Sequence, residues 1–97
     1  MRNISLNIQP NGDFVSVPFT TLKTAFRFRV EYKNAGRGNK VFLETKVDEN
    51  SPEWVFVGAP AAYSNESRII EETVGGVIPG QLFRIITAGP SRVMVID

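Results

Sequence analysis

A regular alternation of apolar and charged residues in the segment Thr24–Lys33 constrains the fold more than any other feature of this chain. Every second position is apolar (Phe26, Phe28, Val30 and Tyr32), and the positions between them are charged (Arg27, Arg29, Glu31 and Lys33). Successive side chains of a β-strand point to opposite faces of the sheet. The segment is therefore predicted to be a strand with one face on a hydrophobic core and the other in water.

Shorter segments with the same period, separated by turn residues, occur along the rest of the chain. With Thr24–Lys33 they give eight expected strands: Ile4–Ile8, Phe14–Val17, Thr24–Lys33, Lys40–Val47, Trp54–Val57, Arg68–Thr73, Leu82–Thr87 and Arg92–Ile96. The first two are expected to form a hairpin around Pro10-Asn11-Gly12, and the segment Ala59–Ser67 is expected to be a loop. Short strands at this spacing predict a single antiparallel β-sandwich over residues 1–97, jelly-roll or immunoglobulin-like, with a small β-barrel as the alternative.

The residue types that are missing bear on function. The chain has no His and no Cys, which removes the usual general base, the thiol nucleophile and the commonest transition-metal ligands. A non-enzymatic protein without cofactor or metal is therefore expected. Its net charge of +1 provides no field for binding nucleic acid or anionic lipid. No apolar run is long enough to be a signal peptide or a membrane-spanning helix, so neither a nucleic-acid nor a membrane partner is expected.

The second half of the chain carries a family resemblance. Val41–Asp48, a short turn and Trp54–Gly58 are followed later by Pro79–Arg84 and Val93–Val95. This order of motifs resembles that of small structural proteins of tailed bacteriophages, and the resemblance covers Val41 to Asp97. It implies a virion protein made in the host cytoplasm, with a capsid decoration or cement protein that bridges major capsid subunits as the first expectation. A tail, head-fibre or adaptor component of the virion is the nearest alternative.

Several expected strands are apolar on the face that should meet water. In Leu82–Thr87, the inward positions predicted for Phe83, Ile85 and Thr87 place Leu82 and Ile86 outside, beside Arg84. The last strand is apolar on both faces. Exposed apolar patches on soluble domains usually mark protein interfaces. The residues predicted to take part in self-association, with a trimer favoured, or in docking on another virion protein are Phe42, Leu82, Arg84, Ile86, Met94 and Ile96.

A carbohydrate-binding module is the second class of function that the sequence leaves open. Tyr32, Tyr63 and Trp54 are the candidates for stacking on sugar rings in that case. For Trp54 a place in the core is the favoured interpretation, because its ring can bury a large apolar area. Arg27, Arg29 and Lys33 share one strand face and could meet an acidic partner, but a solvated charged face is the ordinary explanation.

Overall fold

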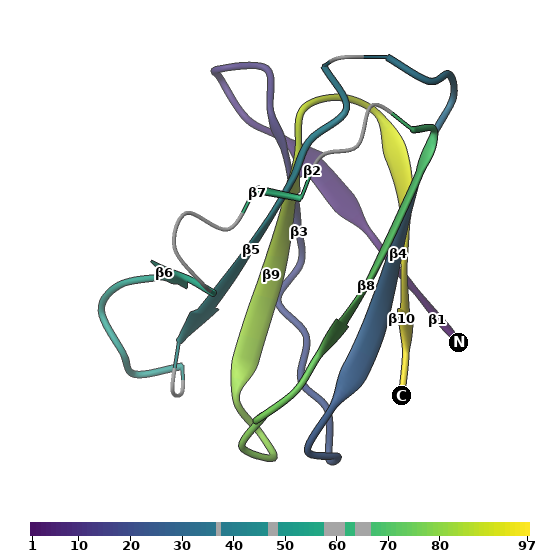
Figure 1. The fold of residues 1–97 in the computed structure, drawn as a ribbon. Coiled ribbons are helices and arrows are strands. Elements are labelled where there is room, and N and C mark those ends of the chain that lie inside the picture. Colours follow the sequence, from purple (N-terminus) through teal and green to yellow (C-terminus); the bar gives the residue numbers. More distant parts are fainter. Residues whose placement is uncertain (37, 47–48, 58–61, 64–66) are drawn as a thin grey trace.

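The computed structural model of this chain describes residues 1–36, 38–46, 49–57, 62–63 and 67–97. In these ranges the chain forms strands and turns without any helix. The strands are β1 (Arg2–Ile4), β2 (Leu6–Ile8), β3 (Phe14–Ser16), β4 (Phe26–Tyr32), β5 (Val41–Lys46), β6 (Val55–Phe56), β7 (Ala62–Tyr63), β8 (Ile69–Val74), β9 (Leu82–Thr87) and β10 (Ser91–Ile96). They build two antiparallel sheets that do not close into a barrel (Figure 1). The predicted β-sandwich is confirmed, and the barrel alternative is wrong.

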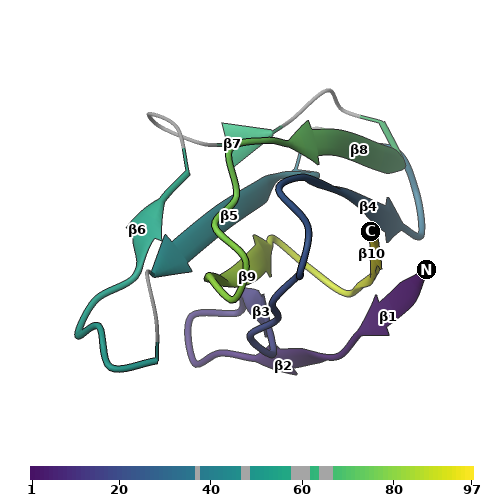
Figure 2. The ribbon, with the colours of Figure 1, turned by 90° about the horizontal axis from the view of Figure 1, so that it is seen from below.

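The two sheets contain strands from distant parts of the chain. One has four strands in the order β1-β10-β4-β8, and the other has six, with β2-β3-β9-β5-β6 in a row and β7 beside β5. The long strands β9 and β10 are consecutive in the chain yet belong to different sheets, so the turn between them crosses from one layer to the other (Figures 1 and 2).

The core lies between the sheets and follows the alternation of the long strands. The four apolar residues of β4 are all buried, as predicted, whereas Arg27, Arg29 and Glu31 lie on the opposite face. An aromatic cluster joins the layers, since the ring of Phe26 lies 4.9 Å from Phe83 and 5.5 Å from Phe19, both edge-on. Such edge-to-face pairs add stability beyond the apolar area that they bury.

The first expected strand is divided between the sheets. Arg2–Ile4 pairs with β10 in the four-stranded sheet, and Leu6–Ile8 pairs with β3 in the six-stranded sheet. The predicted opening hairpin therefore exists only for β2 and β3. The change of sheet is possible because the backbone groups of alternate residues in an extended strand point to opposite edges, so one strand can pair on both sides.

A side chain replaces part of the ladder where β3 separates from β9. The strands pair at Phe14 and Val15, and the bridge between Phe19 and Phe83 restores contact farther along the chain. Between these points lies Pro18, which has no N–H to donate. Ser16 Oγ accepts a hydrogen bond from the Ile85 N–H at 2.8 Å, so this buried donor is satisfied by a hydroxyl.

Two short strands border β5 on its free side. β6 pairs with Glu44 and Thr45, and β7 pairs with Val41 and Phe42. The structure thus places a strand inside the segment expected to be a loop, and the predicted strand Trp54–Val57 is reduced to Val55–Phe56. A two-residue strand cannot display a period, so the sequence carries no signal for β7.

Candidate functional site

The outward face of the six-stranded sheet carries a cluster of partly exposed apolar side chains. The register of the ladders places Ile86 opposite Phe42 on one side and opposite Val15 on the other. Arg84 lies opposite Glu44, and Leu82 lies opposite Lys46. We call this surface the apolar face and define it by Val15, Phe42, Trp54, Phe56, Leu82 and Ile86, together with the charged residues Glu44, Lys46 and Arg84.

Two phenylalanines form the aromatic part of the apolar face. Phe56 lies opposite Glu44 and therefore points to the same side of the sheet as Phe42, whose ring centroid is 5.7 Å from its own. Phe42 is partly buried, but Phe56 remains 51% exposed. A large aromatic side chain with half of its surface exposed to solvent is a candidate anchor for a binding partner.

A charged cluster lies beside the two phenylalanines. Arg84 Nε donates a hydrogen bond to Glu44 Oε1 at 2.6 Å, and both side chains are mostly buried. The guanidinium carbon of Arg84 is 4.5 Å from the centroid of the Trp54 ring, and Lys46 Nζ is 4.8 Å from it. These cation–π contacts hold the indole against the two cations. Trp54 thus joins the segment before β6 to the centre of the apolar face.

A hollow of about 340 Å³ opens beside Phe42 and Ile86. Asp13 and Lys40 stand at it with opposite charges, and Gly38, Thr87 and Ala88 complete its lining. Hollows of this kind receive the anchoring side chains of partners at protein interfaces. The apolar face therefore combines projecting aromatic groups, a recess and charged groups that can give orientation.

The outward face of the four-stranded sheet has a different character. It carries the ion pairs Arg27–Glu71 at 2.9 Å, Arg29–Glu31 at 3.4 Å, Arg29–Glu71 at 3.9 Å and Arg92–Glu31 at 3.9 Å. Charges of both signs alternate across its strands, as is usual for a solvated sheet face. Glu71 on the neighbouring strand β8 and Glu31 on β4 itself thus neutralise Arg27 and Arg29, which supports the interpretation of this surface as a solvated charged face.

The six residues predicted to form an interface do not share one surface. Phe42, Leu82, Arg84 and Ile86 come together on the apolar face. Met94 and Ile96, however, point outward from the four-stranded sheet on the other side of the molecule. Met94 is only 3% exposed there and lies opposite Asn3 and Arg29 on the neighbouring strands. Long neighbouring side chains can cover an apolar group by their aliphatic parts, so this strand needs no partner to bury Met94.

The aromatic residues proposed for sugar stacking have different surroundings. Tyr32 is 6% exposed, and its hydroxyl donates to the carbonyl of Lys40 and accepts from the N–H of Ala88. It belongs to the core and offers no ring face to a ligand. The side chain of Tyr63 lies outside the described residues. The preference for a core position of Trp54 is wrong, because the ring lies on the outer surface of the sheet over Arg84.

Two members of the apolar face were not predicted from the sequence. Phe56 and Val15 lie in short strands, where alternation extends over too few residues to identify the outward face. Their membership follows from the pairing with Glu44 and Ile86. In the part of the chain that the structure describes, no cluster of three or more Asp, Glu, His or Cys residues could hold a metal ion. The same residues include no helix with the length and apolarity needed to cross a membrane.

No family model, no curated protein and no solved structure matches this chain.

Proposed function

We propose that this protein is a non-enzymatic structural subunit that works by docking its apolar face onto another protein. The proposal is carried by one observation, the contrast between the two outer faces of the sandwich. One carries several ion pairs. The other presents Phe42 and Ile86 beside a recess, with Phe56 packed against Phe42. Partner surfaces of proteins are enriched in aromatic residues and arginine and depleted of other charges at their centre.

We propose further that the partner is a virion protein, with the major capsid protein first. The basis is the resemblance of Val41–Asp97 to small structural proteins of tailed bacteriophages. As a cement protein the chain would stabilise a shell by buried contact area, and many copies would add their contributions. Self-association into trimers would match a local three-fold axis of such a shell. A tail, head-fibre or adaptor component would use the same face.

Co-sedimentation with capsid shells that lack the protein tests this proposal. We expect the wild type to sediment with the shells, and Phe42→Asp and Phe56→Asp to lose binding by more than about tenfold, which is roughly 1.4 kcal/mol. Phe56 is the sharper site, because its exposure lets the chain accept Asp without unfolding. Circular dichroism checks the fold of each variant.

Thr73→Asp is the matched control, since Thr73 is exposed on the other sheet opposite Arg27. This variant introduces the same charge and should sediment like the wild type. Equal sedimentation of wild type and Phe56→Asp would reject the apolar face as the docking surface. Failure of the wild type to bind shells, combined with binding to tail or fibre components, would reject the cement function and retain the docking surface.

A further inference from the structure

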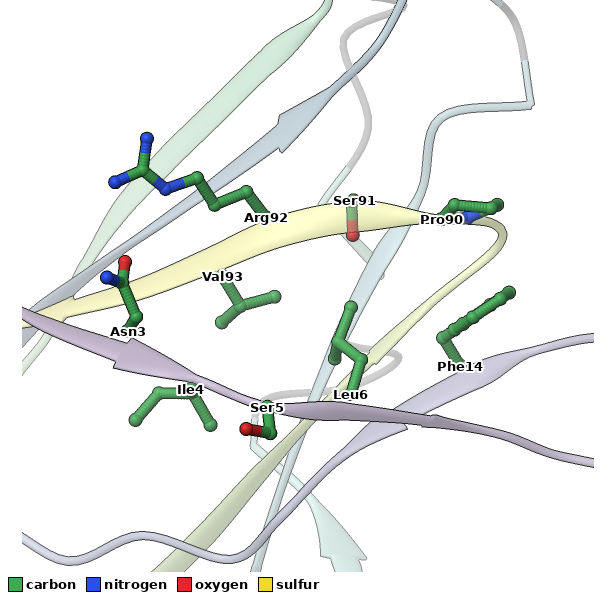
Figure 3. A pocket seen from close by; sticks show the side chains of 9 residues that line it. All are labelled: Asn3, Ile4, Ser5, Leu6, Phe14, Pro90, Ser91, Arg92 and Val93. Carbon is green, nitrogen blue, oxygen red and sulfur yellow. The ribbon is translucent and has the colours of Figure 1, made fainter.

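A groove opens at the side of the sandwich where the N-terminal strand changes sheets (Figure 3). It has a volume of about 390 Å³ and lies between β1 and β2 on one side and the beginning of β10 on the other. Side chains of Ile4, Leu6, Phe14 and Val93 give it an apolar lining, and Asn3, Ser5, Pro90, Ser91 and Arg92 complete it. The groove is separate from the apolar face.

The groove exists because the ladder between β1 and β10 stops early. Its last pair is Ile4 with Val93, and in the same register the following hydrogen-bonded pair would join Leu6 to Ser91. That pair does not form, since β2 has turned toward β3 in the other sheet. In Figure 3 the N-terminal strand and β10 diverge after the pair Ile4–Val93, with Leu6 on one side of the groove and Ser91 on the other.

The backbone of Ser91 points into the groove. Tyr32, which lies opposite Ser91, donates its N–H to the carbonyl of Arg68 at 2.7 Å and so directs its backbone groups away from β10. In an antiparallel ladder, residues that face each other without exchanging hydrogen bonds both direct these groups outward. The N–H and C=O of Ser91 are thus directed away from β4, toward the position that β1 has left.

The edge of β2 is open in the same way. Ser5 and Gln9 are hydrogen-bonded to the residues that flank β3. The Val17 N–H donates to Ser5 O at 2.9 Å, and the Gln9 N–H donates to Asp13 O at 2.7 Å. By alternation, the backbone groups of Leu6 and Ile8 point away from β3. β2 is the terminal strand of its sheet, and Ile8 is 67% exposed. Leu6 and Ile8 therefore offer two donors and two acceptors at the spacing of a β-ladder.

One buried hydroxyl adds a second observation. Among the described residues, Ser91 Oγ has no hydrogen-bond partner although the atom is shielded from solvent. A buried polar group without a partner costs free energy, and each such group in a native structure calls for an explanation, for example local strain or an ordered water. Ser91 lines the groove opposite Leu6.

We propose that this groove binds an extended segment of a partner protein, which adds to β2 as a further strand of the six-stranded sheet. The incoming backbone would bond to Leu6 and Ile8, and alternate apolar side chains would lie beside Leu6 and Phe14, which are partly exposed in the lining of the groove. Strand addition is a general way for a sheet edge to recognise a peptide. The free N–H and C=O groups of Leu6 and Ile8 lie in a row along β2. An extended chain can bond to all of them, whereas a compact ligand cannot, so an extended chain is the favoured occupant.

The test uses a random library of end-capped peptides of about seven residues, the length of an ordinary strand. The wild-type protein should select peptides that slow hydrogen exchange of the Leu6 and Ile8 amides in NMR spectra. Ile8→Pro removes the N–H that points away from β3 without removing a donor of the β2–β3 ladder, and proline is tolerated at a sheet edge. This variant should bind a selected peptide more than about tenfold more weakly, which corresponds to roughly 1.4 kcal/mol.

Ile8→Thr is the matched control, because it changes the same side chain and keeps the N–H; it should bind like the wild type. Phe56→Asp should also bind normally, so failure of the docking proposal and failure of this one are distinguishable. Equal binding by Ile8→Pro, or selected peptides that leave both amides unprotected, would overturn the inference. Protection of the same amides by concentrated protein alone would identify a second copy as the occupant and overturn it as well.

Discussion

Arg84 and Glu44 face each other directly across the ladder between β9 and β5, and Arg84 Nε lies 2.6 Å from Glu44 Oε1. The same guanidinium supports the ring of Trp54 at 4.5 Å. The carboxylate therefore fixes the arginine, and the arginine fixes the indole. A single cross-strand pair thus organises the charged cluster of a face that is otherwise apolar.

This pair should be energetically coupled. In a double-mutant cycle of Glu44→Gln and Arg84→Met, we expect a coupling free energy of about 1 to 2 kcal/mol, because both side chains are shielded from solvent screening. Urea denaturation of the four proteins measures it, with fluorescence of Trp54, the chain's single tryptophan, as the signal. The indole emission of the folded Arg84→Met variant should also differ from that of the wild type.

The pair Arg27–Glu71 provides the comparison, since its oxygen-to-nitrogen distance is 2.9 Å but its side chains are 54% and 33% exposed. Its coupling should not exceed about 0.5 kcal/mol, as is usual for exposed ion pairs. If both cycles gave the same small value, the Glu44–Arg84 pair would not organise the apolar face.

Ser16 and Ser91 should respond differently to replacement by alanine. Ser16→Ala leaves the buried Ile85 N–H without an acceptor and should reduce the free energy of unfolding by about 1 to 3 kcal/mol. Ser91→Ala removes a buried hydroxyl that has no partner among the described residues, and it should change stability by less than about 0.5 kcal/mol or increase it. Thermal or urea unfolding measures both. A larger loss for Ser91→Ala would show that its hydroxyl is bonded in the folded protein.

Asp97 should make stability depend on pH in the acidic range. Burial acts to raise the pKa of its carboxyl, but hydrogen bonds from Thr21 and Arg2 and the charges of Arg2 and Lys23 outweigh it and hold the pKa below its usual range. Arg2 reaches the carboxylate at 2.7 Å. A lowered pKa in the folded state means that the unfolded chain binds the proton more readily. The contribution is thus complete at neutral pH and is lost as the pH falls below about 4.

Asp97→Asn removes this contribution at all pH values. It should lower the free energy of unfolding at pH 7 by up to about 1 kcal/mol, as for a partly exposed ion pair, and should have a smaller effect at pH 3. Urea denaturation at the two pH values measures the difference. An equal loss at pH 7 and pH 3 would mean that the amide disturbs packing and that the charge of Asp97 is unimportant.

The long strands show how far the sequence alone determines this fold. Alternation in β4 and β9 correctly assigned Phe28 and Phe83 to the core and Arg84 to the outside, because a side chain's face depends only on its parity along the strand. The same rule identified Phe42, Leu82 and Ile86 as outward groups. The class of fold and the faces of the long strands β4 and β9 were therefore readable before the structure.

Only the tertiary structure decided which outward faces belong together. Parity assigns Met94 and Ile86 to outer faces but does not say that these faces lie on different sheets. The alternation does not tell whether Trp54 faces the core or the outside, because Trp54 precedes β6, a strand of two residues that is too short to show a period. Every ladder uses the same backbone groups, so the sequence does not specify strand neighbours through hydrogen bonding. Packing in the completed sandwich selects them, and with them the apolar face and the groove where β1 leaves β10.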